Sequence, residues 1–514
     1  MNFTENKMSN STTRKIKLNF IFSLLAQAVT LFVGIIVPRL FIINFGSEVN
    51  GYINSINQIF VYIALLEAGV GSAAVFSLYS PVGHGDKDKI NGILSATHRF
   101  YRRTAWIYLG IIIVLSFVYP LLVKSSLSYP LMVGIFLISG CGGVVAYFFH
   151  AKYKLLLDVD GKSYVISVIT SVYQIALSLG KAIFLLLGWH ILLVQSLYVA
   201  LSLVQAAVFG WYIKKSYPWL NLKARPDNAS ISKSKNAFVH QISGLIFNNT
   251  DVLILTFVCD LKVVSVYALY KTLVSLVGAL ITHFLNSINF KLGQTFEDKP
   301  KFLKMFDAFE TFHITLTFSL CTVAYLFLLP FMRLYTNGMD ANYLLTYMPL
   351  LAIASEILSY IRLPAQSVIT FAGHFKETQW RSVAESVINL TTSLILVFVF
   401  EHYWGLGIYG VLLGTVLALL YRTNDILIYA NKKILNRSPK KVYTTCVVCL
   451  IISVAFVAVF NMVDFKFANY LTLTIGAAIT CITVIIVQFI ANFAVDRASG
   501  KFVISLLKGK HLNK

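Results

Sequence analysis

Apolar runs long enough to cross a lipid bilayer recur along the whole chain. A membrane-spanning helix needs about 20 mainly apolar residues. Fourteen segments of the 514-residue sequence meet this length, at residues 18–44, 51–79, 104–123, 130–150, 164–187, 190–213, 236–258, 263–290, 309–334, 342–371, 382–401, 405–430, 442–462 and 469–495. Segments of this length satisfy their backbone hydrogen bonds in lipid as helices. The sequence therefore predicts an all-α integral membrane protein with about 14 transmembrane helices.

The composition agrees with a chain that lies mostly in lipid. Charged residues make up 13% of the sequence and hydrophobic residues 57%, whereas soluble domains carry about 25% charged residues. The net charge is nevertheless +21. Such a surplus suits either nucleic acid or a membrane surface, and the distribution of the basic residues decides between the two.

The basic residues lie almost entirely on one side of the predicted membrane. Of the 43 Lys and Arg residues, 34 fall in the eight segments of one side, 6 fall inside spans, and only Lys124, Lys262 and Lys466 fall on the other side. The positive-inside rule places the basic side in the cytoplasm. We therefore expect a multi-pass protein of the cytoplasmic (inner) membrane, in contact with its lipids and with both termini inside. Charge spread over eight segments forms no groove, so nucleic acid is not an expected partner.

A weak internal repeat divides the predicted spans into two lobes. RLFIINFGSEVNGY, from Arg39, aligns with DVLILTFVCDLKVVSVY, from Asp251, so that each copy has a charge shortly before a short loop. We predict an N-terminal lobe at 1–213, a cytoplasmic basic linker at 214–235 and a C-terminal lobe at 236–430. An extra helix pair and a basic cytoplasmic tail follow at 431–514. Both six-helix lobes begin on the same side, and parallel repeats of this kind place a substrate path between the lobes.

Ionisable residues inside spans are candidates for function, because each must face a partner or a polar cavity. The candidate cavity cations are Arg39, Lys181, Lys271 and Arg362, and the candidate charge partners or ion-coupling groups are Glu67, Asp251 and Glu356. Arg422 and Asp425 are one helical turn apart, so we expect them to pair with each other.

The depth of each charge separates the candidates further. Lys271 is nine residues beyond Lys262, roughly 13 Å into the membrane at 1.5 Å per residue, too deep to reach water cheaply. Arg39 lies in the outer half of its span, directly after Pro38. It either extends outward to water or faces the path, where Asp251 is its counterpart in the repeat.

The sequence lacks the motifs of nucleotide binding, zinc binding and thiol redox chemistry. A phosphate-binding loop needs GxxxxGK followed by Ser or Thr, but Leu156 stands where the first glycine of Gly161-Lys162-Ser163 should be. The ten histidines form no HExxH pattern, and the CxxC of Cys446 and Cys449 lies inside an apolar run. We therefore expect no cofactor, no metal and no enzymatic activity. The loops between the predicted spans are too small to hold a catalytic domain. The sequence therefore predicts a transporter without an ATP-binding motif.

Three stretches resemble a known family. They are GDKDKINGILSA (85–96), KYKLLLDVDGKSYVISVI (152–169) and Asp251-Val-Leu-Ile-Leu with Val266-Tyr267 beyond it. The chain is similar over its whole length to the bacterial oligosaccharide (O-antigen type) flippases. These polysaccharide-biosynthesis transporters belong to the multidrug/oligosaccharidyl-lipid/polysaccharide exporter superfamily.

The resemblance implies two lobes around a central cavity. It implies movement of an undecaprenyl-diphosphate-linked oligosaccharide from the inner to the outer leaflet by alternating access, for cell-surface polysaccharide biosynthesis. A coupling cation or the membrane potential would drive it, and a polysaccharide polymerase would be a partner. A diphosphate needs cations to cross the bilayer, and Arg39, Lys181, Lys271 and Arg362 would supply them.

Three alternatives stay open at this point. A cation-coupled multidrug exporter of the same superfamily would use acidic residues in its cavity. A flippase for a lipid-linked peptidoglycan precursor would share both the fold and the cationic cavity. A membrane enzyme acting on lipid-linked sugars would need a large outer loop or paired carboxylates at a cavity mouth.

Overall fold

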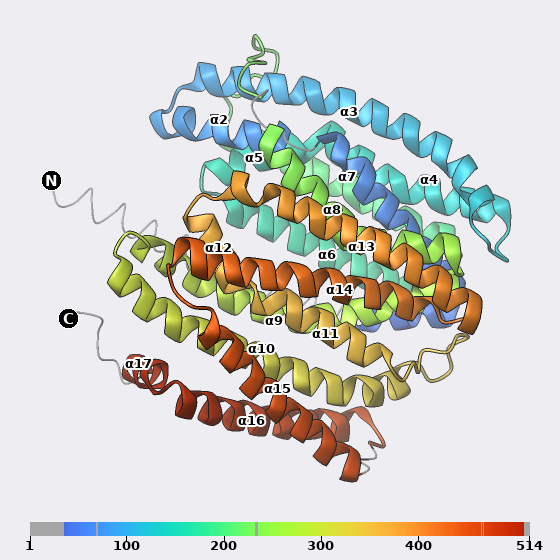
Figure 1. Ribbon diagram of the computed structural model, residues 1–514. Coiled ribbons are helices and arrows are strands. Elements are labelled where there is room, and N and C mark those ends of the chain that lie inside the picture. The colour runs from blue at the N-terminus through green and yellow to red at the C-terminus, as the bar shows by residue number, and fades with distance from the viewer. Residues whose placement is uncertain (1–34, 68–69, 232–234, 464, 466, 508–514) are drawn as a thin grey trace. The chain divides into compact units, whose positions relative to one another are not determined.

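The structure is a computed structural model that describes residues 35–507 except 68–69, 232–234, 464 and 466 (Figure 1). The described part of the chain is helical and contains no strand. After the first described helix, Ile35–Glu67, come α2 (Val70–His84), α3 (Lys87–Leu122), α4 (Tyr129–Val145), α5 (Ala151–Val159), α6 (Ser163–Leu186), α7 (Ile191–Ser216), α8 (Lys235–Val258), α9 (Leu261–Thr295), α10 (Lys299–Tyr335), α11 (Met348–Ile361), α12 (Leu363–Phe371), α13 (Phe375–Trp404), α14 (Gly407–Tyr429), α15 (Lys440–Val463), α16 (Tyr470–Val495) and α17 (Arg497–Leu507).

The predicted all-helical membrane fold is confirmed, but the number fourteen is not. Eleven described helices are long and apolar enough to span a membrane, and the bent pair Ile35–Glu67 and Val70–His84 raises the number to twelve. Most of the predicted span at 18–44, and the basic tail before it, lie outside the described residues. In the predicted span at 236–258, only Ile242–Val258 qualifies, as a shorter apolar helix.

Two predicted loops are wrong because helices continue through them. Residues 45–50 are helical, although Gly46 has a φ of 85°, a left-handed value that interrupts a right-handed helix. The long basic loop at 80–103 consists mostly of the ends of α2 and α3. The Asp86 carboxylate accepts a hydrogen bond from the Lys89 backbone at 3.1 Å and caps α3. A helix need not end where the bilayer does, which hydropathy alone does not reveal.

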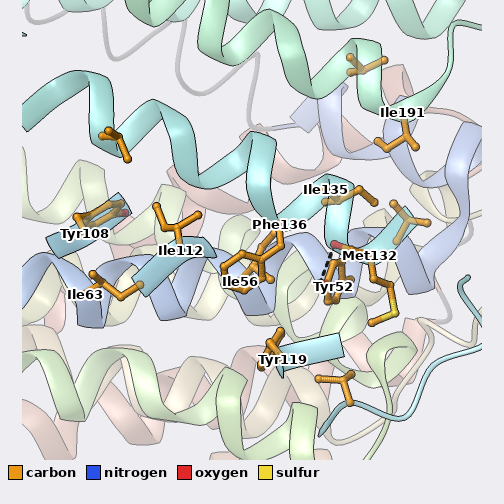
Figure 2. Packing of buried hydrophobic residues seen from close by; sticks show 14 of the residues in the cluster. Tyr52, Ile56, Ile63, Tyr108, Ile112, Tyr119, Met132, Ile135, Phe136 and Ile191 are labelled. Carbon is orange, nitrogen blue, oxygen red and sulfur yellow. Dashed lines mark hydrogen bonds between the residues drawn. The ribbon is translucent and has the colours of Figure 1, made fainter. Parts of the chain in front are cut away.

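The chain forms two compact units, residues 1–265 and 266–514. The first unit includes α8, so its boundary differs from that of the predicted lobes, which stay a prediction. A core cluster of this unit packs around Tyr52, Ile56 and Phe136, all fully buried (Figure 2). The Tyr52 hydroxyl donates to the Met132 carbonyl at 3.0 Å. That bond satisfies the polar tip of a ring that otherwise contributes only apolar surface.

The motif at 85–96 packs against the predicted linker within the first unit. The Asn91 side chain accepts from the Asn221 backbone at 2.8 Å, and the Ser95 hydroxyl donates to the Ala224 carbonyl at 2.7 Å. The Gly92 carbonyl accepts from the Asp227 backbone at 3.0 Å. The small and polar residues of this motif therefore hold the segment after α7 in place.

The second motif, at 152–169, contains a compact polar cluster. Asp160 pairs with Lys162 at 2.8 Å and accepts from the Tyr217 hydroxyl at 2.6 Å. Burial lowers the pKa of Lys162, but the hydrogen bonds to Asp160 and Tyr217 outweigh it and leave that pKa above its ordinary value. The charged residues of the motif thus join the start of α6 to the end of α7.

In the second unit, α15, α16 and α17 pack beside α10 (Figure 1). Buried polar groups connect them: Gln488 donates to Ser453 at 3.0 Å and accepts from Ser319 at 3.1 Å. At the basic end, Lys441 pairs with Asp496 at 2.8 Å and with Asp307 at 3.3 Å. Polar contacts hold helices together in lipid, where apolar contact alone has little driving force.

The predicted span at 342–371 is broken into α11 and α12 at Arg362. Pro364 has no N–H to donate to the Tyr360 carbonyl four residues earlier. His313, which is fully buried, contacts that carbonyl through Nε2 at 3.0 Å. Since a carbonyl only accepts, Nε2 carries the proton. A side chain from α10 therefore replaces the backbone bond that proline removes.

Helices α13 and α14 pack closely at a glycine. A Cβ on Gly410 would lie 2.5 Å from the Leu396 carbonyl carbon and oxygen. Backbone atoms cannot move aside as a side chain can, so the two helices depend on this glycine.

We expect Gly410→Ala to destabilise the protein by about 1–3 kcal/mol through overpacking. The matched control is Gly210→Ala on α7, where an added Cβ meets nothing within 4 Å. Thermal unfolding of the purified proteins should show a lower midpoint for Gly410→Ala only. Equal midpoints would contradict the close packing of α13 and α14.

Candidate functional site

The seven charged residues singled out by the sequence fall in both units. Four lie in the first unit, namely Arg39, Glu67, Lys181 and Asp251, and three in the second, namely Lys271, Glu356 and Arg362. The structure brings some of them together within a unit, and their roles in binding stay predictions.

Lys271 and Glu356 come together inside the second unit. Lys271 is on α9, where its ammonium lies 5.8 Å from the centre of the Tyr267 ring. Glu356 is on α11, where it shares a hydrogen bond with the Tyr360 hydroxyl and lies within the field of Lys271. A cation on α9 and a carboxylate on α11 thus lie within electrostatic reach of one another.

The Tyr360 ring is held tightly beside this pair. A Cβ on Gly278 would lie 1.9 Å from the Tyr360 hydroxyl, so only glycine lets the ring reach this place. Thr282, one turn further along α9, also hydrogen-bonds to that hydroxyl. Sequence reasoning missed Gly278, Thr282 and Tyr360 because none of them is charged.

Arg362 belongs to a different group, a network of five charges that joins α11, α13 and α14. Arg362 donates to Glu385 at 2.6 Å, and Arg422 lies 3.3 Å from the other oxygen of that carboxylate. Arg422 pairs with Asp425 at 2.7 Å, as the sequence predicted, and Asp425 also pairs with Arg381. We call these five residues the arginine network.

The arginine network is buried at its centre and open at one edge. The side chains of Arg422 and Glu385 are 7% and 10% exposed, whereas that of Arg381 is 39% exposed. Its net charge is +1, so two carboxylates already compensate most of the charge that Arg362 would offer to a substrate. The sequence suggested no partner for Arg362, because Glu385 is 23 residues away in sequence and on another helix.

In the first unit, Glu67 ends the helix Ile35–Glu67 and accepts a hydrogen bond from the Tyr101 hydroxyl at 2.8 Å. Tyr147, whose ring centre is 6.1 Å from that of Tyr101, also hydrogen-bonds to Glu67. Two phenols therefore hold this carboxylate at the 47° bend before α2. The sequence signal for them was weak, since tyrosine is common throughout the chain.

The remaining predicted residues of the first unit differ in their surroundings. Asp251 is 3% exposed on α8, whereas Arg39 and Lys181 are half-buried. Among the described residues, Lys181 makes no ion pair or hydrogen bond. Asp251 and Arg39 each take part in an interaction, and their pairing with one another stays a prediction.

Charge reversal tests that pairing. Arg39→Asp and Asp251→Arg should each reduce transport at least about tenfold, because each leaves two like charges in lipid. The double variant Arg39→Asp/Asp251→Arg should recover most of the activity. If the double variant is no more active than the single ones, the two residues do not pair.

Three hydroxyl and amide contacts join the first described helix to α8 and the residues after it. Asn50 donates to Ser265 at 2.7 Å. The other two contacts are Ser55 to Thr256 at 2.7 Å and Tyr62 to Thr250 at 2.6 Å. Both threonines donate to carbonyls of their own helix, so Ser55 and Tyr62 are the donors. Polar contacts of this kind contribute to the association of helices in lipid.

The part of the chain that the structure describes contains no group of three His, Cys, Asp or Glu side chains able to hold a metal ion.

Comparison with solved structures identifies the fold. The lipid II flippase MurJ in an inward closed conformation matches with a TM-score of 0.66 and 17% identity, over 92% of this chain and 97% of that one. An inward-facing multidrug resistance MATE family transporter of the MOP superfamily matches with a TM-score of 0.56 and 13% identity, over 80% and 99%. The MATE multidrug transporter DinF-BH matches with a TM-score of 0.54 and 16% identity, over 82% and 97%.

The fold of this multi-pass membrane protein is therefore that of the transporters of the MOP superfamily. No family model and no curated protein matches the chain. At identities of 13–17% the likeness concerns the fold, and the substrate has to be argued from the residues.

Proposed function

We propose that the protein is a flippase that moves an undecaprenyl-diphosphate-linked oligosaccharide from the inner to the outer leaflet of the cytoplasmic membrane. It works by alternating access and serves cell-surface polysaccharide biosynthesis. In this proposal both termini are cytoplasmic, and a coupling cation or the membrane potential drives the cycle.

The helix pair α15–α16 is the observation that carries the proposal. The match to the lipid II flippase covers 92% of the 514 residues, which is more than the 430 residues before the pair. The multidrug transporters cover 80–82%, which the first 430 residues alone can supply. The pair is built into the second unit through Gln488 and Lys441, and it supports a lipid-linked substrate over a small drug.

The charges inside the spans give the proposal its chemistry. Lys271, Arg39 and Lys181 lie in helices that apolar residues otherwise fill. A diphosphate carries at least two negative charges, and its transfer into a low-dielectric medium is prohibitive without cations. We propose Arg39, Lys181, Lys271 and Arg362 as its ligands, with Glu67, Asp251 and Glu356 as charge partners or ion-coupling groups.

A second candidate is a flippase for a lipid-linked peptidoglycan precursor. The higher TM-score and coverage of the lipid II flippase favour it, and its substrate class would use the same cations. A cation-coupled multidrug exporter is less favoured, because Lys271 adds positive charge where a drug cation would sit.

Reconstitution into proteoliposomes tests the proposal. A fluorescent sugar on undecaprenyl diphosphate should become accessible to an external quencher, whereas one on a neutral polyprenol should not. Transport of a peptidoglycan precursor but of no other lipid-linked oligosaccharide would select the second candidate. Efflux of a cationic dye without movement of either lipid would overturn both.

A further inference from the structure

A π-helical turn interrupts one span of the first unit. This turn, η2 (Ala146–His150), lies between α4 and α5. Turns of this kind carry an extra residue, leave carbonyl groups without their usual partners, and are frequent at functional sites. Here the Lys152 ammonium donates to the Phe148 carbonyl at 3.1 Å and to the Phe149 carbonyl at 3.0 Å.

Lys152 is a buried cation without a carboxylate partner. It is 3% exposed, and no Asp or Glu of the described residues forms an ion pair with it. Two neutral carbonyls accept two of its three possible hydrogen bonds but do not compensate its charge. A buried charge left in this state costs several kcal/mol, so an anion that binds beside it would be strongly favoured.

Two histidines next to Lys152 carry buried nitrogens with no partner. The Nδ1 atoms of His98, on α3, and of His150 make no hydrogen bond within the described part of the chain. Buried polar atoms are nearly always satisfied, so these two nitrogens are open to a ligand that can form a hydrogen bond with them. Lys152 and Arg102 are the charges that act on His98, and Lys152 and Lys154 act on His150.

The groups around this place are otherwise cationic or aromatic. The His150 ring stacks on the Phe209 ring, with 5.3 Å between the ring centres. The Lys154 ammonium lies 5.6 Å from the centre of the Phe209 ring. Glu67 is the carboxylate that interacts electrostatically with Lys154. It already accepts a hydrogen bond from the Tyr101 hydroxyl. His98 and Lys154 are half-buried and Arg102 is exposed, so positive charge extends from the surface to the buried ammonium.

We propose that Lys152, Lys154, His98 and His150 form a phosphate-binding site, which takes the diphosphate headgroup of the polyprenyl carrier as it enters from the inner leaflet. The inference rests on the proposed function and adds a site separate from Arg39, Lys181, Lys271 and Arg362. Lys152 is 23 residues beyond Tyr129, the first residue of α4. That is about 35 Å along the span, against a hydrocarbon thickness of about 30 Å, so the site lies at headgroup level on the basic side.

Binding of farnesyl diphosphate to the full-length protein in phosphatidylcholine nanodiscs tests the site. We expect the Kd of Lys152→Met to be at least tenfold higher than that of the wild type, and Lys152→Arg to recover part of the loss. Lys162→Met is the matched control: this lysine belongs to the same motif but is paired with Asp160, and its Kd should not change. Equal Kd values for wild type and Lys152→Met would overturn the inference.

A second variant guards against misfolding, because Lys152 also bonds the π-helical turn. His98→Phe leaves both carbonyl bonds of Lys152 in place, and it too should weaken binding. If its Kd is unchanged, the site is not the one proposed. A difference between wild type and variants that appears only in phosphatidylglycerol-rich discs would assign the site to membrane lipid instead of the carrier. Failure of the wild type to bind any polyprenyl diphosphate would instead contradict the proposed function.

Discussion

Lys271→Ala is expected to abolish delivery of lipid-linked sugar to the outer leaflet, with a loss of at least about tenfold in proteoliposomes, equivalent to about 1.4 kcal/mol of barrier. The protein should still accumulate to normal levels, because Lys271 is exposed on α9 and fills no core. In a cell that depends on the protein, surface polysaccharide should disappear. Quencher-accessible fluorescence measures transport, and an immunoblot of membranes measures the amount of protein.

The matched control is Lys291→Ala on the same helix. Lys291 is also exposed, but it lies 20 residues further along α9, near its end. Transport by this variant should stay within twofold of the wild type. Full transport by Lys271→Ala would show that Lys271 is not required as a ligand of the diphosphate. It would also contradict the role of Lys271 as the counter-charge of Glu356.

Glu385→Gln should cause the largest loss of stability of any single substitution in the second unit. The variant keeps the shape of the side chain but removes the charge that compensates Arg362 and Arg422. Removing one partner of a buried ion pair costs about 3–5 kcal/mol. A unit of this size should then unfold at a temperature lower by roughly 6–20 °C, as measured by scanning fluorimetry of the purified protein.

Arg381→Gln provides the comparison within the same network. Its side chain is 39% exposed and pairs with Asp425 at the open edge. Exposed ion pairs contribute about 0–1 kcal/mol, so the unfolding temperature should change by only a few degrees. If both variants unfold at the same temperature, burial does not separate the centre of the arginine network from its edge.

Hydropathy and charge predicted the class of fold well because lipid imposes strict conditions on a chain. The lengths of the apolar segments and the placement of 34 basic residues on one side change little when the end of one predicted span is moved by a few residues. The positions of helix ends were less predictable. The basic residues between 87 and 103 belong to α3, since water permits a helix to continue past the bilayer. The left-handed φ of Gly46 within the first described helix is a property of one residue, which apolar patterns do not encode.

Charge alone identified where polar chemistry lies but not which groups meet. Arg422 and Asp425 were predictable as a pair because helical spacing fixes their distance. Glu385 was not, because its contacts with Arg362 and Arg422 depend on how three helices pack. Lys152 was assigned to a loop, although it is 3% exposed. Only packing distinguishes a buried lysine from one that faces water.

The contact between His313 and the Tyr360 carbonyl has a consequence for how the span of α11 and α12 can move. In lipid, a helix that bends must leave a backbone N–H unpaired wherever a turn opens. At Pro364 there is no N–H to leave unpaired, and the free carbonyl is already held by α10. One fewer backbone hydrogen bond therefore holds the span at this point, and a change of its angle there would act directly on the contact between Arg362 and Glu385 of α13.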